Sequence, residues 1–221
     1  MAKDPYQKTA KKYDRYVESS IADIRQIGMK MYPPQEGMHV LDVGCGTGTT
    51  LKLYHEVGCR VFGIDLSPAM VEVAKKKLKD RAEIRQGDAS KMAYPDGLFD
   101  LVIGFLTLHE MPSQIRPAVI SEMLRVMKPE GRILLIDHHP GPIRFPKGWI
   151  YRPIILFFEI MAGREHFRNY RDFISRKGLP NLISTQNLMV VSKKIISGGN
   201  IALFLVNSEC ASHHSSTPLL A

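Results

Sequence analysis

The sequence has little of what marks secreted, disulfide-bonded or membrane-spanning proteins. Its 221 residues include only three cysteines, an odd number at wide spacing that favours neither a disulfide framework nor a zinc site. A bilayer-spanning helix needs roughly 20 apolar residues, whereas the most apolar stretch outside the candidate strands, 153–163, is short and is interrupted by Glu159. The charged N-terminus is not followed by the apolar segment of a secretory signal. We therefore expect a cytoplasmic protein.

Acidic residues are also scarce, with 22 Asp and Glu against 30 Lys and Arg, which gives a net charge of +8. The excess of positive charge is concentrated between residues 140 and 180, a segment with eight basic and three acidic residues. A basic surface attracts nucleic acid, anionic lipid or an acidic substrate, but it is equally compatible with an ordinary solvated face. The 44% hydrophobic and 24% charged content is that of a globular protein and excludes disordered, collagen-like and coiled-coil chains.

Strand-like and helix-like segments alternate through the first 140 residues. The expected strands are 39–43, 60–64, 83–86, 100–105 and 132–137. The expected helices are 49–57, 68–78 and 113–127, followed by a turn at 129–131. This alternation implies an α/β, Rossmann-like, doubly wound parallel sheet with helices on both faces. Two later β-rich runs, 188–194 and 200–206, predict an antiparallel C-terminal hairpin that completes a mostly parallel, seven-stranded sheet.

The flanking segments do not follow this alternation. Residues 1–208 are expected to form a single domain, in which 1–35 are helices over the sheet and 140–168 an insertion or lid. Residues 140–163 mix proline, glycine and large apolar side chains with no clear period, and a further helix is expected at 170–178. The Ser- and His-rich residues 209–221 predict a disordered tail.

The most informative motif is VLDVGCGTG, residues 40–48. A strand runs into Gly44, Gly46 and Gly48, and a helix follows. Because glycine has no Cβ, such a turn lets the backbone approach a ligand closely at the carboxyl edge of a sheet. Asp65 lies 17 residues after Gly48, at the end of the second strand, where a carboxylate can accept hydrogen bonds from ribose hydroxyls.

Two residues disfavour a dinucleotide at this motif, and with it an NAD-dependent oxidoreductase. Asp42 lies in the first strand, two residues before the first glycine, and would repel a pyrophosphate. Thr49 occupies the third glycine position of the dinucleotide fingerprint. A ligand that carries an ammonium and a sulfonium group would instead be attracted by Asp42.

Four more segments follow the glycine motif in a fixed order. They are GIDLSPAM (63–70), QGDAS (86–90), FDLVIGFLTLHEM (99–111) and LRVMKPEGRILLID (124–137). With these segments the sequence resembles the class I S-adenosylmethionine-dependent methyltransferases, in the small-molecule group that includes quinone and lipid methylating enzymes. The resemblance implies S-adenosylmethionine as the cofactor and a small, apolar acceptor, quinone-like or lipid-like.

The resemblance also implies which residues bind the cofactor. The methionine part would contact Asp42, Gly44, Cys45, Gly46 and Gly48. The ribose and adenine would contact Asp65, Leu66, Met70, Asp88 and Ala89. Phe105 would lie beneath the sulfonium, and Tyr13 would close over the cofactor carboxylate. Met70 and Tyr13 are equally compatible with packing roles, and Asp65 with a helix cap, although Ser67 already suits that cap.

A general base is needed only if the acceptor is a hydroxyl or a weak acid, because the sulfonium already activates the methyl group. His109, just after the fourth strand, is the first candidate, with a structural histidine as the alternative. His138 and His139, after the fifth strand, are further candidates. They could form a metal site with Asp137, but adjacent histidines generally point apart, so no metal is expected.

Other functions stay open on the sequence alone. A non-catalytic S-adenosylmethionine-binding regulator would keep the same cofactor motifs. The positive charge suggests a tRNA or RNA methyltransferase, but GFLT (104–107) stands where base-amino methylation would want an NPPY-type tetrapeptide, so nucleic acid is disfavoured. The glycine loop GCGTG and the LTLHEMP segment differ from the stricter ubiquinone and menaquinone pattern, so the acceptor is left open.

The segment 145–163 bears on the acceptor as well. It contains Trp149 and ten other large apolar residues, more apolar surface than a solvated loop exposes. Arg144, Lys147 and Arg152 lie at or near its start. Three interpretations follow: a helix packed on the core, a homodimer surface, or a lid over an apolar acceptor that touches a membrane surface.

Overall fold

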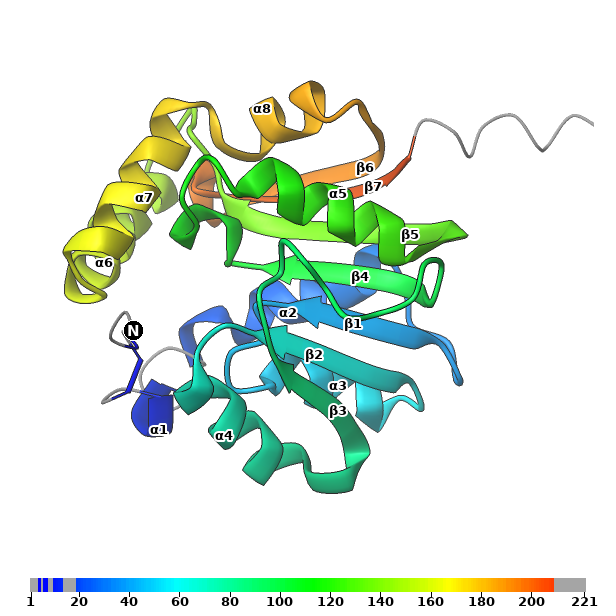
Figure 1. Ribbon diagram of the computed structural model, residues 1–221. Helices are drawn as coiled ribbons and strands as arrows, with labels where there is room; N and C mark the ends of the chain where they lie inside the picture. The colour runs from blue at the N-terminus through cyan, green and yellow to red at the C-terminus, as the bar shows by residue number, and fades with distance from the viewer. Residues whose placement is uncertain (1–3, 5, 8–9, 14–18, 209–221) are drawn as a thin grey trace, which may run out of the picture.

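The structure, a computed structural model, describes residues 4, 6–7, 10–13 and 19–208, except for the side chains of residues 12–13 and 19–20 (Figure 1). The tail predicted at 209–221 lies outside the described residues. The fold is a seven-stranded sheet with helices on both faces, as the sequence predicts. The strands are β1 (His39–Val43), β2 (Arg60–Asp65), β3 (Ala82–Gln86), β4 (Phe99–Phe105), β5 (Met127–His138), β6 (Leu188–Ile196) and β7 (Ile201–Ser208).

The strand order is β3-β2-β1-β4-β5-β7-β6. The first five strands pair in parallel, and β7 pairs antiparallel with both β5 and β6. Chain order reverses between β1 and β4, so the crevice outside their carboxyl ends is the expected position for a ligand in this class of sheet. The predicted C-terminal hairpin is confirmed, and η4 (Ser197–Gly199) forms its turn.

The helices cover the sheet because its central strands alternate apolar side chains between the two faces. Along β4, Leu101 and Ile103 belong to one apolar cluster, whereas Val102 belongs to the other. The first cluster packs against α2 (Ser19–Met31), α3 (Thr49–Glu56) and α4 (Pro68–Leu78). The second packs against α5 (Arg116–Val126), α7 (Arg164–Ser175) and α8 (Gly178–Thr185). The remaining helical segments are α1 (Ala10–Tyr13), α6 (Lys147–Met161), η2 (Lys79–Arg81) and η3 (Leu108–Glu110).

Three sequence predictions need correction. The helix expected at 170–178 is two helices, α7 and α8, separated at Lys177, whose φ of 65° lies in the left-handed region. The turn expected at 129–131 falls within β5, where the pairing with β4 skips from Met127 to Arg132. Residues 147–161 form the helix α6, although their sequence shows no clear period. The exposed side chains of α6 are mostly apolar, so the sequence lacks the alternation of apolar and polar positions that marks an amphipathic helix.

Arg116 joins the loop after β4 to α7. Its side chain is 2% exposed and donates to the carbonyl oxygens of Leu108, Met111 and Asn169. It also forms an ion pair with Asp172, with 2.9 Å between Nη1 and Oδ2. The short helix η3, which begins at Leu108, is therefore held against α7 by one guanidinium group.

This contact gives a test of the fold. Arg116→Ala removes the donor to the carbonyl oxygens of Leu108, Met111 and Asn169, and an unsatisfied buried polar group costs about 1–3 kcal/mol. We therefore expect this variant to lower the free energy of unfolding by about 3 kcal/mol in a urea titration. Arg176→Ala is the control, because Arg176 also binds Asp172 at 2.7 Å but is 61% exposed. It should cost less than about 1 kcal/mol. Equal losses in the two variants would contradict the anchoring role of Arg116.

Candidate functional site

The glycine loop lies at the carboxyl end of β1, as predicted. The N–H groups of Gly44 and Cys45 both donate to the carbonyl of Ile64 on β2, which fixes the loop against the sheet. Gly44 has a φ of 72°, and a Cβ there would lie 2.1 Å from Thr107 Oγ1. At Gly46 a Cβ would meet no atom of the described residues within 4 Å. The loop therefore packs tightly against Thr107 at Gly44. The space beside Gly46 is free of the described residues, so a ligand can approach the backbone there.

Asp65 ties this loop to the start of α4. Its Oδ2 accepts from the Gly46 N–H and its Oδ1 from the Ser67 N–H, both at 2.8 Å. Ser67 itself caps α4 through the Met70 N–H, so the cap role is filled as the sequence suggests. Burial raises the pKa of Asp65 to about 6; the two backbone donors oppose this shift, and the nearby charges of Glu110 and Asp4 add to it.

The other expected cofactor residues are distributed around the same edge. Asp42, Cys45, Met70 and Phe105 are buried, whereas Leu66 is 71% exposed. Asp88 is exposed, and its Oδ1 accepts from both the N–H and the hydroxyl of Ser90. Ala89 is half-buried, and Gly48 is the N-cap residue of α3. The side chain of Tyr13 lies outside the described side chains. Burial raises the pKa of the Cys45 thiol, which disfavours a nucleophilic thiolate at this position.

Sequence reasoning missed the residues that cover these positions. The Arg25 guanidinium lies 4.3 Å above the Phe105 ring and donates to Thr50. Asp4 accepts from the Ser67 hydroxyl and the Ala69 N–H at the start of α4. A residue this close to the N-terminus carries no sequence signal for such a contact.

Tyr6, from the N-terminal segment, contacts the short helix η3. Its hydroxyl donates to Glu110 Oε2 at 2.7 Å. Because Asp4 binds α4 and Tyr6 binds η3, the N-terminal segment bridges the ends of β2 and β4. The predicted role of Tyr13 stays a prediction, because its side chain lies outside the described side chains.

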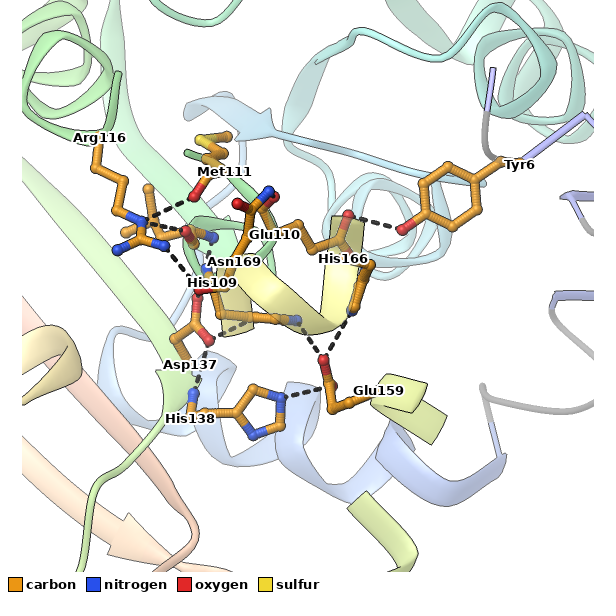
Figure 2. A network of polar contacts seen from close by, with 11 residues as sticks. Tyr6, His109, Glu110, Met111, Arg116, Asp137, His138, Glu159, His166 and Asn169 are labelled. Atoms are coloured by element: carbon orange, nitrogen blue, oxygen red, sulfur yellow. Dashed lines mark hydrogen bonds and ion pairs between the residues drawn. The ribbon is translucent and has the colours of Figure 1, made fainter. Parts of the chain in front are cut away.

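The candidate bases His109 and His138 lie together at the ends of β4 and β5, and Figure 2 shows them with their carboxylate partners. His109 is 3% exposed, and its Nδ1 lies 2.7 Å from Asp137 Oδ1. Asp137 also accepts from the backbone N–H groups of Leu108, His109 and His138. His139 points away, with its Nδ1 3.1 Å from the Gly199 carbonyl, so the two adjacent histidines diverge as expected.

Glu159 of α6 completes this group, and it is the main residue that the sequence analysis did not assign. It is 7% exposed, and Figure 2 shows its carboxylate between histidines. Its Oε1 lies 3.1 Å from His138 Nε2, and its Oε2 lies 2.7 Å from His166 Nε2 and 3.6 Å from His109 Nε2. The signal that could have found Glu159 is its place as the only acidic residue of α6. We call His109, His138, His166, Asp137 and Glu159 the histidine cluster.

Charge pairing dominates the protonation of this cluster. Burial alone would lower the pKa of His109, but the carboxylates of Asp137 and Glu159 outweigh it and raise that pKa to about 9. Burial would raise the pKa of Glu159, but the neighbouring histidines hold it well below its usual range. The two carboxylates therefore favour the protonated form of His109. Its role as a general base stays a prediction, and this arrangement does not favour it.

Comparison with known proteins identifies the class. The family described as "Methyltransferase domain" matches residues 41–135. Demethylmenaquinone methyltransferase of Lactococcus lactis is 32% identical over 190 residues, which cover 79% of this chain and 75% of that protein. Phosphatidylethanolamine N-methyltransferase of Cereibacter sphaeroides is 38% identical over 175 residues, which cover 76% and 79%. A crystal structure of a SAM dependent methyltransferase from Aquifex aeolicus has a TM-score of 0.65 at 21% identity, covering 93% and 98%.

The chain therefore belongs to the S-adenosylmethionine-dependent methyltransferases. Its donor is S-adenosylmethionine, and its partner is a small-molecule methyl acceptor. The family, fold, enzyme class and cofactor predicted from the sequence are confirmed.

The raised pKa of Asp65 predicts a pH dependence of cofactor binding. Ribose hydroxyls donate best to an ionised carboxylate, so affinity should be full above pH 6 and fall as Asp65 is protonated below it. We expect the Kd of S-adenosylhomocysteine, measured by calorimetry, to rise about tenfold from pH 7 to pH 5. Asp65→Asn should bind about ten- to a hundredfold more weakly at pH 7, with a flat profile.

The control for this measurement is Asp80→Asn, which removes an exposed carboxylate at η2. It should keep both the affinity and the pH profile of the unaltered protein. A flat profile in the unaltered protein, or normal binding by Asp65→Asn, would exclude the ribose contact.

Proposed function

We propose that this enzyme transfers the methyl group of S-adenosylmethionine to an apolar acceptor, quinone-like or lipid-like, at a membrane surface. The observation that carries the proposal is the orientation of α6. Within this helix only Gly148 and Glu159 are buried. Its exposed apolar side chains include Trp149, Ile150, Ile154, Phe157, Ile160 and Met161, of which Trp149 is 69% and Met161 68% exposed. The helix α6 therefore directs the Glu159 carboxylate inward and most of its large apolar side chains toward solvent.

The position of α6 suits an acceptor lid. It follows β5, and with α7 it extends past the carboxyl edge of the sheet, on the side where α1 also lies (Figure 1). Arg144, Lys147 and Arg152 are exposed beside its apolar side chains. A helix binds to a membrane surface through two contributions: apolar side chains enter the interface, and basic residues lie near anionic headgroups. Among the described residues no helix is long and apolar enough to cross a membrane.

A groove between α6 and α7 supports the same type of acceptor. It encloses about 590 Å³, and its apolar wall includes Leu156, Phe167 and Tyr170. Its basic residues are Arg152, Arg164, Arg168 and Arg171. An apolar wall with a guanidinium rim suits an acceptor that has a lipid body and an anionic or polar head. The names of the two relatives, which specify demethylmenaquinone and phosphatidylethanolamine, agree with this class.

The residues at the carboxyl edge fit the cofactor. When bound, S-adenosylmethionine supplies a methyl group already activated on a sulfonium sulfur. In our proposal Asp65 accepts from the ribose, the open backbone at Gly46 lies against the methionine part, and Asp42 provides negative charge beneath it. The chain's task is then to align the acceptor with the methyl group and to exclude water, which the bridge from Tyr6 to Glu110 and the cover of α6 would accomplish.

The single tryptophan makes the membrane contact measurable. Trp149 emission should shift to the blue on addition of anionic vesicles, and raised salt should weaken the shift. Burying a large apolar side chain contributes about 1.5–3 kcal/mol, so Phe157→Ser should weaken vesicle binding about tenfold or more. Val191→Ser is the matched control, because Val191 is 50% exposed on β6, away from α6. It should bind vesicles normally.

Methyl transfer identifies the acceptor directly. We expect turnover with a demethylated quinol or a phospholipid presented in vesicles, and none with tRNA. An unshifted Trp149 spectrum together with efficient methylation of a water-soluble acceptor would contradict the membrane proposal. Methylation of tRNA would overturn the acceptor class.

A further inference from the structure

We propose that the histidine cluster binds one divalent transition-metal ion through His109 Nε2, His166 Nε2 and the Glu159 carboxylate. The sequence analysis expects no metal and considers only Asp137 with His138 and His139. The structure brings together a different set, from η3, α6 and α7. The inference goes beyond methyl transfer, and its test does not depend on that activity.

The spacing of the ligand atoms fits a tetrahedral ion. Zinc binds imidazole nitrogen and carboxylate oxygen at about 2.0–2.2 Å, so two ligand atoms of a tetrahedral site lie about 3.4 Å apart. Glu159 Oε2 lies 3.6 Å from His109 Nε2 and 2.7 Å from His166 Nε2. The three residues each offer a ligand atom within 4.8 Å of the others. Small side-chain movements therefore suffice to bring all three onto one ion.

The hydrogen bonds of His109 are typical of a histidine that binds a metal ion. Its Nδ1 is engaged by Asp137 at 2.7 Å, which leaves Nε2 to point at Glu159. Metal-bound histidines typically donate their other nitrogen to a carboxylate, which fixes the tautomer and the ring orientation. Asp137 is itself held by three backbone N–H groups, so it cannot easily turn away. Glu110 lies 4.0 Å from His166 Nδ1 and repeats this arrangement more loosely.

The same contacts disfavour the alternative set His109, Asp137 and His138. The Asp137 oxygens are already used by the His109 ring and by backbone donors. His138 Nε2 instead lies 3.1 Å from Glu159 Oε1. The contacts of His109 and His166 are with the other carboxylate oxygen, Oε2. We assign His138 the role of orienting the Glu159 carboxylate from outside the ligand set.

Charge balance also favours an ion. Two buried carboxylates, Asp137 and Glu159, lie among three imidazoles, with the rings of Tyr170 and Phe173 beside them. Buried charges are stable when they are paired or bind a metal. A dication would balance the charges of both carboxylates. Two imidazoles and one carboxylate suit zinc, and three protein ligands leave a fourth position for water or an acceptor oxygen.

The test is metal content and coordination in the full chain. After treatment with a chelator, the protein is equilibrated with Zn²⁺, freed of unbound metal and assayed by mass spectrometry. We expect about one equivalent per chain, and with Co²⁺ the visible absorption of a tetrahedral ion. His166→Gln, at the least buried ligand, should lose the metal and the absorption, with its fold checked by circular dichroism.

His139→Gln is the control, because this neighbouring imidazole contacts the Gly199 carbonyl and faces away from the cluster. It should keep one equivalent. Glu159→Gln provides a second ligand variant and should lose the ion as His166→Gln does. Fewer than about 0.1 equivalents in the unaltered protein, or full metal content in the folded His166→Gln variant, would overturn the proposal.

Discussion

Glu159 is the residue on which the arrangement of the acceptor side depends. It lies on a helix that is otherwise almost entirely apolar, and it is the residue that faces inward to the histidines. A buried carboxylate is costly unless it is paired and hydrogen-bonded, and the histidine cluster supplies that pairing. Because the contact fixes the rotation of α6, the aromatic side chains of this helix face outward. One polar interaction thus decides where the apolar surface of the enzyme lies.

The same cluster connects the two halves of the site. His109 and Asp137 lie at the ends of β4 and β5, next to the glycine loop that follows β1. Thr107, just before η3, packs against Gly44 of the glycine loop. Glu110, at the end of η3, accepts a hydrogen bond from Tyr6 of the N-terminal segment. The residues that contact the glycine loop, α6 and the N-terminal segment thus lie within a few positions of one another, from Thr107 to Glu110.

The sequence predicted the shape of the glycine loop and the start of α4 because both features are local. The glycine loop, the Ser67 cap and the end of β2 are each defined by residues within a few positions of one another. Turn geometry and strand alternation act at that range, so their patterns are visible in the chain. The contact between Tyr6 and Glu110 joins residues 104 positions apart, and no local pattern predicts it.

The sequence by itself determined the doubly wound sheet, the position of the glycine loop and the family, through alternation of apolar residues and ordered motifs. Only the tertiary structure decided the environment of His109 and the orientation of α6. Glu159 and His166 lie 50 and 57 residues after His109 in the chain, and no local pattern specifies that their side chains meet. Their contact is set by the packing of α6 against α7 and of α7 against η3, which brings the Glu159 carboxylate to the histidines.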